Sequence, residues 1–250
     1  MRAIFILGLL ACCVAASAQD HERETRLSEQ TLAALVVGDP VQLEQKNGYR
    51  FLGLYTRAAK ERGAVVIAHG RGWSPDFDLY ADLRTQLADA GYSTLSIQMP
   101  VLAGTAKLGD YLTIFSDSDE RFSLAIKWLR TNGAHNVGIV SHSLGATMAN
   151  HYLINGPDAA ADAWVFISII NGLEDMFRIK IPVLDVFGSD DWEVTRFGAD
   201  ERKAQILKIA NSQQVVVAGA QHFFEGKRAE LTRDVVVFLD RVFKQGKTGR

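Results

Sequence analysis

The feature that most constrains the fold is a series of short apolar runs that begins after residue 60 and alternates with helical patterns. Each run is rich in β-branched residues and lacks polar alternation, which is typical of strands that are covered on both faces. The runs that we interpret as strands are 64–68, 93–97, 137–140, 163–170, 183–187 and 214–217.

Apolar residues at helical spacing separate these runs. The clearest series are Leu79, Leu83 and Leu87, then Phe122, Ile126 and Leu129, and finally Leu231, Val235, Phe238, Leu239 and Val242. Strand and helix in alternation predict an α/β fold, with a mostly parallel central sheet and helices on both faces.

The remaining segments leave little room for a second domain. Lys46-Asn47-Gly48 lies between extended runs at 41–44 and 49–55, which predicts an antiparallel hairpin at the start of the sheet. The connection 170–182 is too short to hold an inserted domain. We therefore expect one domain over residues 36–250 without a large lid domain.

Residues 1–18 combine a basic start at Arg2, an apolar stretch of about 14 residues and small residues at 16–18. This is the pattern of a secretory signal peptide that is cleaved before Gln19. The stretch is shorter than the roughly 20 residues of a membrane-spanning helix, so no stable membrane insertion is expected. The mature protein is expected in the periplasm or outside the cell, with a lipoprotein lipidated at Cys12 as the alternative.

Both cysteines fall inside that segment, so a chain cleaved before Gln19 contains neither a disulfide nor a thiolate metal site. Residues 19–35 are polar and without periodicity, and we interpret them as a mobile lead-in or a short surface helix without chemistry. The net charge of -2 argues against nucleic acid as a partner. The sequence predicts no particular oligomeric state.

Polar residues directly after the apolar runs are the candidates for chemistry, because ligands bind at the carboxyl ends of parallel strands. The run 137–140 is followed by Ser141-His142-Ser143-Leu144-Gly145 and then by a helical stretch at 147–155. A serine at such a tight strand-to-helix turn exposes its hydroxyl oxygen. The backbone N–H of Leu144 and the start of the helix would stabilise negative charge that develops there during acyl transfer.

This segment resembles the GxSxG nucleophile elbow of α/β-hydrolases, in particular the branch of secreted bacterial serine hydrolases and esterases. The resemblance extends from about residue 64 to the C-terminus. It implies that Ser143 is the nucleophile. The first glycine of the pattern is replaced by Ser141, which is small enough for the turn to form.

A second candidate is the loop His69-Gly70-Arg71-Gly72-Trp73, which follows the run 64–68. Glycines let the backbone turn and direct N–H groups at one point, as an oxyanion hole requires. The resemblance implies that the backbone of Arg71 supplies the second donor, with Gly72 as the alternative, and that His69 is structural. The Arg71 side chain would either contact an anionic substrate group or remain solvated.

The acid and the base follow the last two strands. By resemblance, an acid three residues after Gly188 orients the catalytic histidine, which favours Asp191 over Asp190 and Glu193. Asp185 lies within a strand and is interpreted as a structural hydrogen-bonding residue. His222 would take the proton of Ser143 and return it to the leaving group. The chain order of serine, acid and histidine is the order expected for this fold.

The other histidines are interpreted without chemistry. His142 should point away from the nucleophile, His151 should lie on a helix, and His21 and His135 should be exposed. No spacing among the histidines suggests a metal site, and the proposed chemistry needs no cofactor.

The connection 98–118 is long and rich in apolar residues. It would either line an apolar acyl or aryl pocket above Ser143, through Leu102 and Phe115, or merely cover the sheet edge.

The expected activity is hydrolysis of a small-molecule carboxylic ester through an acyl-enzyme. A thioesterase or peptidase would use the same residues, and a non-catalytic envelope or binding protein that retains the fold is the rival from another class.

Overall fold

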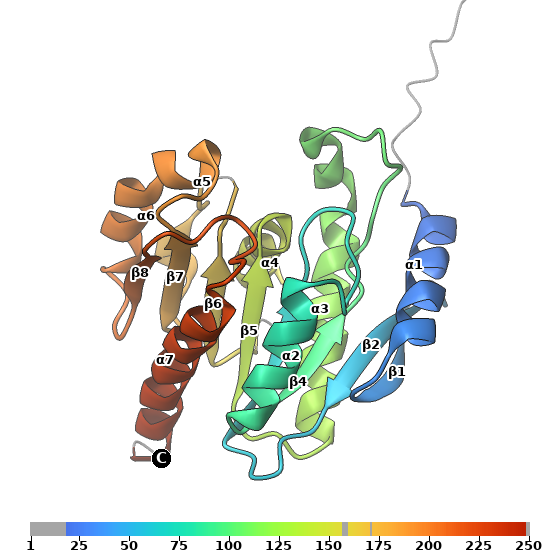
Figure 1. Cartoon of the computed structure of the whole chain (residues 1–250), viewed down its shortest axis with the longest axis horizontal. Coiled ribbons are helices and arrows are strands. Elements are labelled where there is room, and N and C mark those ends of the chain that lie inside the picture. The colour runs from blue at the N-terminus through green and yellow to red at the C-terminus, as the bar shows by residue number, and fades with distance from the viewer. Residues whose placement is uncertain (1–18, 157–159, 171, 249–250) are drawn as a thin grey trace, which may run out of the picture.

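The computed structural model describes residues 19–156, 160–170 and 172–248, so the predicted signal peptide lies outside it. Eight strands form one sheet in the order β1-β2-β4-β3-β5-β6-β7-β8 (Figure 1). Their bounds are β1 Asp39–Glu44, β2 Arg50–Thr56, β3 Gly63–Ala68, β4 Tyr92–Ile97, β5 Val137–His142, β6 Ala163–Ile167, β7 Val183–Gly188 and β8 Gln213–Val217.

The pairing of the strands confirms the predicted mostly parallel sheet. β1 and β2 form the predicted antiparallel hairpin, in which Gly48 has a φ of 82° that favours glycine. β2 is also antiparallel to β4, and all later pairs are parallel. In this register Ala68 lies opposite Ser141, and His142 lies opposite Ile167. The carboxyl ends of β3, β5 and β6 therefore meet at one edge of the sheet.

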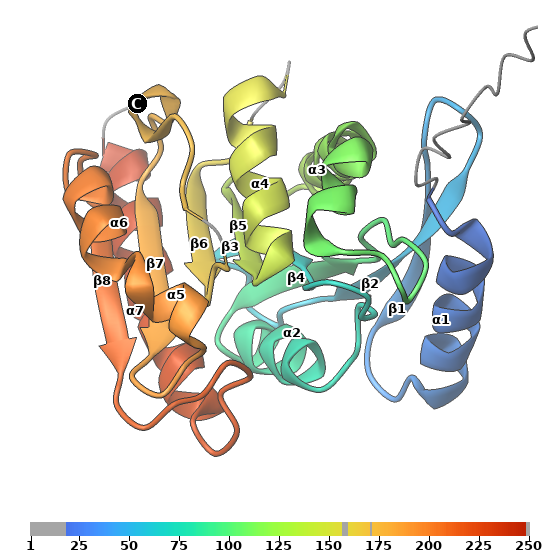
Figure 2. The same ribbon diagram turned by 90° about the horizontal axis from the view of Figure 1, so that it is seen from above.

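Helices cover both faces, as predicted. α2 (Leu79–Asp89) and α7 (Arg228–Thr248) lie on one face, and α3 (Phe115–Thr131) and α4 (Leu144–Asn155) lie on the other (Figure 2). The last residue of α6 (Ala199–Ile206), Ile206, is buried in the same apolar cluster as α3 and α4.

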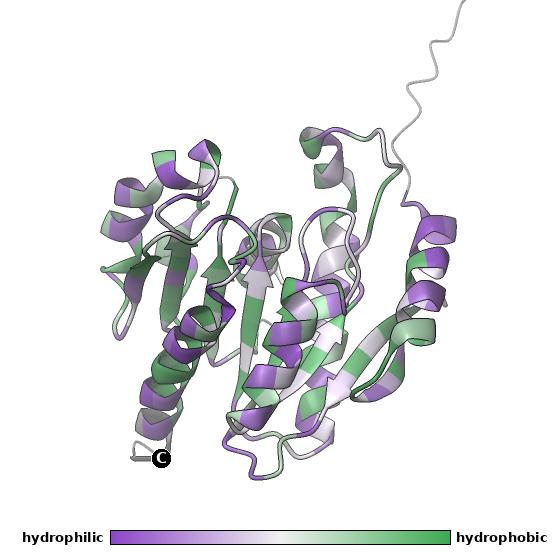
Figure 3. Ribbon diagram, in the orientation of Figure 1, coloured by the Kyte–Doolittle hydropathy of each residue, from purple (hydrophilic) through white to green (hydrophobic). Residues whose placement is uncertain are grey.

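Alternation along the strands divides the core into two apolar clusters. Val65 packs with α2 and α7, and the next residue, Val66, packs with α3 and α4. Successive side chains of a strand point to opposite faces, so a strand buried on both faces must be apolar throughout. Figure 3 shows the hydrophobic central strands between helices whose outer faces are hydrophilic. Each fully buried aliphatic side chain contributes about 1.5–3 kcal/mol.

Two segments differ from the sequence-based prediction. β6 ends at Ile167 rather than at residue 170, because Ser168 has a φ of 49° and leaves the extended conformation. The connection after β4 contains a 3₁₀ helix, η1 (Leu108–Ile114), and α3 begins directly after it at Phe115. Between β6 and β7, the described residues contain only the short η2 (Met176–Arg178).

Of the two alternatives for the polar N-terminal segment, the structure has the helix: α1 spans His21–Ala34, and it is anchored rather than mobile. Asp20 begins it, because its side chain accepts a hydrogen bond from the N–H of Arg23 at 2.9 Å. Glu24 is 1% exposed and forms a 2.8 Å ion pair with Arg121 of α3, which is fully buried. Removing one partner of such a pair typically costs about 3–5 kcal/mol. Helix α1 is therefore an integral part of the domain.

Within the described ranges, no helix combines the length and the apolar character that crossing a membrane requires.

Candidate active site

Ser143 lies at the turn between β5 and α4. Its φ of 55° and ψ of -125° are strained for a residue with a Cβ atom, and its N–H donates to the Ile167 carbonyl at 2.9 Å. The turn requires glycine two residues later, because a Cβ at Gly145 would lie 2.4 Å from the His69 carbonyl oxygen. The sequence therefore forces the serine outward while the helix start packs tightly on the end of β3.

Ser141 replaces a glycine without disturbing this turn. Its hydroxyl donates to the Val165 carbonyl at 3.2 Å and accepts from the Trp164 indole N–H at 2.9 Å. Its side chain thus lies towards β6, away from the nucleophile.

The three side chains predicted as a triad come together at the carboxyl edge of the sheet. His222 Nε2 lies 3.1 Å from Ser143 Oγ, and His222 Nδ1 lies 2.7 Å from Asp191 Oδ1. Because the Asp191 carboxylate can only accept, the proton of the neutral imidazole lies on Nδ1. Nε2 is then the acceptor that faces the serine hydroxyl, which is the arrangement that general-base attack needs.

The surroundings of Asp191 keep it ionised. Burial alone would raise the pKa of its carboxyl, but hydrogen bonds from His222, the Ser168 hydroxyl and the Trp192 N–H outweigh burial and lower that pKa. Asp190 is exposed and accepts only from Ser189.

The other acidic residues considered form no hydrogen bond with His222. Asp185 is buried in β7, where it binds Arg202 and Gln214, in line with its predicted structural role. Glu193 is exposed at the start of α5 (Glu193–Phe197).

His222 is held on two sides. The Trp192 indole stacks on its ring, with centroids 3.6 Å apart and planes 7° from parallel. On the other side, His142 Nε2 lies 2.9 Å from the His222 carbonyl oxygen. The stacked indole fixes the plane of the imidazole, and the carbonyl contact fixes the backbone of the loop that carries it.

A hydrogen-bond chain connects this loop to the loop after β3. The Gly70 N–H donates to the Tyr80 hydroxyl at 2.8 Å, and that hydroxyl lies 2.8 Å from His142 Nδ1. Since the His222 carbonyl can only accept, His142 carries its proton on Nε2 and accepts from Tyr80 at Nδ1. Both ring nitrogens of His142 are therefore occupied, one by Tyr80 and the other by the His222 carbonyl.

His69 is also buried. Its Nε2 accepts from the Met99 N–H at 2.9 Å, so it fastens the loop after β3 to the chain after β4. Burial lowers the pKa of His69 to about 4 and, together with the neighbouring His222, that of His142 to about 3. Both imidazoles are therefore neutral at physiological pH.

These two lowered pKa values predict acid sensitivity. Between pH 6.5 and about 4 the unfolded chain binds protons at His69 that the folded chain does not, so stability falls as pH falls. Each such histidine contributes about 1.4 kcal/mol per pH unit in this window. Urea unfolding of His69→Gln from pH 7 to pH 4.5 should show a shallower pH dependence than wild type. The exposed His135→Gln variant serves as the control, and parallel curves for His69→Gln and wild type would contradict the prediction.

A cavity of about 340 Å³ reaches the triad and gives access to Ser143, which is only 6% exposed. Besides Ser143 and His222, its walls are mostly apolar or aromatic and come from Arg71, Trp73, Leu108, Ile170, Trp192, Val194 and Phe223. A volume of this order suits a small organic ligand.

The proposed pocket role of Leu102 and Phe115 is wrong. Leu102 is fully buried and Phe115 is 6% exposed, and both pack in the core on the α3 and α4 face of the sheet. From the connection 98–118, Leu108 of η1 reaches the cavity instead. The segment mainly covers the sheet, because its apolar side chains fill the space beside the first turns of α3.

The two predicted oxyanion donors border the nucleophile. Neither the Leu144 N–H nor the Arg71 N–H donates to another described group, whereas the Gly70 N–H is committed to Tyr80. Arg71 and Ser143 line the same cavity, and Leu144 is the first residue of α4. Both N–H groups are therefore available to a negative oxygen bound beside Ser143, and the start of α4 adds the positive end of a helix dipole.

The remaining histidines lie outside the cavity lining. His151 on α4 lies 2.9 Å from Asp119, and its ring lies 5.3 Å from that of Phe115. His21 is exposed and packs on the ring of Tyr49 at 4.0 Å, and His135 is exposed.

Sequence reasoning missed several side chains that shape the site. Ser168 was interpreted as part of an apolar strand, although a polar residue at the true end of β6 was a usable signal. Trp192 directly follows the predicted acid and could have been suspected on that ground. Tyr80 lies in an apolar helical series, where nothing distinguishes it from a core residue.

Comparison with known proteins adds two findings. A family model described as a protein of unknown function (DUF3530) matches residues 12–113, less than half of the chain and short of all three triad positions. A sequence search of curated proteins gives no significant match.

Many solved structures resemble the fold. Est1E from Butyrivibrio proteoclasticus has a TM-score of 0.67 at 14% identity, over 83% of this chain and 100% of its own. The esterase Pf2001 from Pyrococcus furiosus has a TM-score of 0.65 at 17% identity, over 82% of this chain and 93% of its own.

A third similar structure is XC6422 from Xanthomonas campestris, described as an α/β serine hydrolase without lid. It has a TM-score of 0.62 at 16% identity, over 83% of this chain and 95% of its own. Together with the strand order and the placement of Ser143, this likeness identifies the architecture: the chain has the α/β-hydrolase fold.

Proposed function

We propose that the protein is a serine hydrolase that cleaves small carboxylic esters through an acyl-enzyme on Ser143. The observation that carries the proposal is the continuous contact from Ser143 Oγ to His222 at 3.1 Å and from His222 to Asp191 at 2.7 Å. No group on this path needs a cofactor.

In the first half of the reaction His222 Nε2 takes the hydroxyl proton while Ser143 Oγ attacks the ester carbonyl carbon. Asp191 stabilises the imidazolium, and the N–H groups of Leu144 and Arg71 stabilise the oxyanion. His222 then returns the proton to the departing alkoxide, and the acyl group stays on Ser143. Water, deprotonated by the same imidazole, releases the carboxylic acid and restores the hydroxyl.

The cavity supports an ester with apolar or aromatic parts. Trp73, Trp192 and Phe223 supply aromatic walls, and Leu108, Ile170 and Val194 supply aliphatic ones. Thioesters and peptides would use the same residues, but no specific contact favours them. We further propose that the enzyme works outside the cytoplasm, on the strength of the signal-like residues 1–18.

A fluorophosphonate probe tests the proposal directly. It should add to one serine of the purified protein, and peptide mapping should place the adduct on Ser143. Ser143→Ala and His222→Ala should both lose the adduct while keeping the wild-type circular dichroism spectrum. A folded wild-type protein that stays unlabelled would instead favour a binding protein that retains the fold.

A further inference from the structure

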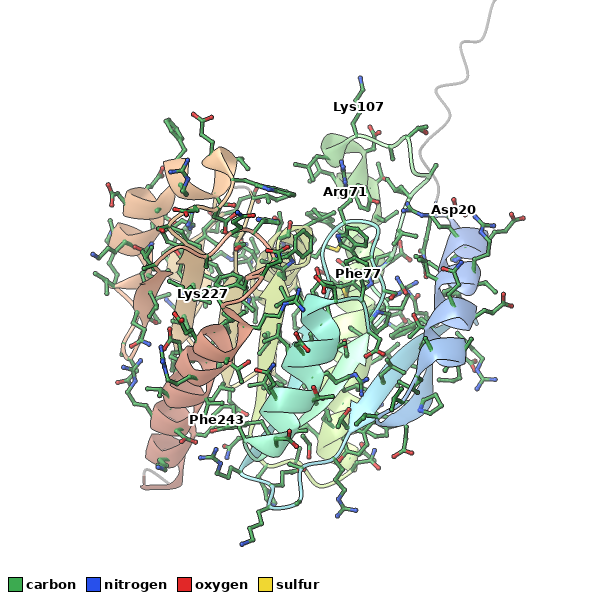
Figure 4. The ribbon with its side chains drawn as sticks, in the orientation of Figure 1. Asp20, Arg71, Phe77, Lys107, Lys227 and Phe243 are labelled. Atoms are coloured by element: carbon green, nitrogen blue, oxygen red, sulfur yellow. The ribbon has the colours of Figure 1, made fainter. Side chains whose placement is uncertain are left out.

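A second, smaller cavity of about 170 Å³ adjoins the active-site cavity. The two share Arg71 and Trp73 as lining residues, so they meet at the loop after β3. The smaller cavity is also lined by Arg23 from α1 and by Tyr111 from η1. Figure 4 shows Arg71 at the same end of the molecule as Lys107 and as Asp20, the residue that begins α1.

Both guanidinium groups of this cavity lack an acidic partner among the described residues. Arg23 Nη1 donates to the Leu102 carbonyl at 2.7 Å, and Nη2 donates to the Gly72 carbonyl at 3.3 Å. These acceptors are neutral, so they orient the guanidinium without cancelling its charge, and they engage only two of its five N–H donors. The lining of the cavity contains no carboxylate.

Other arginines of the protein behave differently. Arg84, Arg121 and Arg202 each form an ion pair with a carboxylate at 2.5–2.9 Å. The adjacent Glu24 cannot neutralise Arg23, because it is committed to Arg121. Two cations without an ion-pair partner in one concave site raise the local concentration of anions, and arginine binds carboxylates in a planar, bidentate geometry.

We propose that this small cavity, which we call the arginine subsite, binds a carboxylate carried by the substrate. The ester would lie with its carbonyl at Ser143 and its apolar portion between Trp73 and Trp192. Its free carboxylate would lie between Arg71 and Arg23. The preferred substrates are thus half-esters of dicarboxylic acids or esters of carboxylated aryl groups, an assignment that rests on the proposed esterase function.

The test compares charged and neutral esters of equal length. The charged esters are 4-nitrophenyl half-esters of dicarboxylic acids with four to seven carbons, and butyrate esters of hydroxybenzoates. Each is paired with a neutral ester in which a methyl group replaces the carboxylate. Wild type should prefer the charged member of at least one pair by about tenfold or more in kcat/KM, with an optimum at one chain length. The preference should shrink as salt rises from low to high ionic strength.

Each variant is compared with wild type by the ratio of kcat/KM for the charged ester to kcat/KM for the neutral ester. A general loss of activity lowers both values equally and leaves this ratio unchanged. Arg71→Glu and Arg23→Gln should bring the charged-to-neutral ratio down to one or below. Arg57→Gln removes a charge from an exposed position that lines neither cavity, and should keep the ratio. Equal hydrolysis of all charged and neutral pairs, with Ser143-dependent turnover intact, would overturn the subsite and leave the esterase function standing.

A binding measurement separates the subsite from catalysis. Calorimetry with Ser143→Ala should detect the best half-ester, and adding Arg71→Glu should weaken its binding about tenfold or more. Absence of any ester turnover together with this Arg71-dependent binding would sink the proposed function and keep the subsite. Half-ester binding that is insensitive to both arginines would sink the subsite.

Discussion

Replacing Ser143 by alanine is expected to lower kcat for a 4-nitrophenyl ester by about 10⁶-fold, because no other nucleophile among the described residues contacts His222 Nε2 and the residues of a triad act as one unit. Steady-state hydrolysis, followed by nitrophenolate absorbance, measures the loss. A small substitution at this turn preserves its backbone, so the melting temperature should stay close to that of wild type. The remaining rate should come from the oxyanion donors and from binding alone.

Ser141→Ala is the matched control for this experiment. It removes a neighbouring hydroxyl that bonds Trp164 and Val165 rather than His222. It should lose about 1–3 kcal/mol of stability, since the Trp164 N–H is left without a partner, while kcat changes only a few-fold. A large loss of kcat in Ser141→Ala and a small one in Ser143→Ala would identify Ser141 as the nucleophile and refute our assignment.

The second large loss of kcat is expected when Asp191 is substituted. Asp191→Asn should lower kcat about 10⁴-fold, because an amide in this position stabilises the wrong tautomer of His222. The fall should appear in kcat more than in KM, since Asp191 is covered by His222, Ser168 and Trp192 and lines no part of the cavity.

Asp190→Asn provides a control of identical chemistry one residue away. The Asp190 side chain is exposed and hydrogen-bonds only Ser189 among the described residues, so this variant should retain nearly full kcat. A silent Asp191→Asn would show that another group orients the imidazole.

Much of the fold could be predicted because burial on both faces imposes its own pattern. Runs such as those ending at Ala68 and Val140 are apolar at every position, and the helices between them repeat their apolar residues at helical spacing. The segments that carry Ser143, Asp191 and His222 follow from the same logic, since each segment leaves the carboxyl end of a strand of this parallel sheet, whereas the choice of Asp191 depended on the resemblance to α/β-hydrolases.

The parts that escaped prediction depend on contacts between distant segments. Helix α1 has few apolar residues on its buried side and is held by Glu24, whose partner Arg121 lies 97 residues away. Likewise, Leu102 and Phe115 are as apolar as a pocket wall would be, and only packing decides that they face the core. Sequence periodicity predicts which side chains are buried, but it does not predict which distant segment packs against them.

The series of hydrogen bonds from Gly70 through Tyr80 and His142 to His222 can run in only one donor-to-acceptor direction. It starts at an N–H that can only donate and ends at a carbonyl that can only accept, so every hydrogen along it is fixed. A proton added to His142 would occupy Nδ1, so the Tyr80 hydroxyl would lose the acceptor of its own hydrogen. One proton, on the residue next to Ser143, would thus weaken the contacts that tie the loop after β3 to the loop of His222, so the two loops would lose their order together.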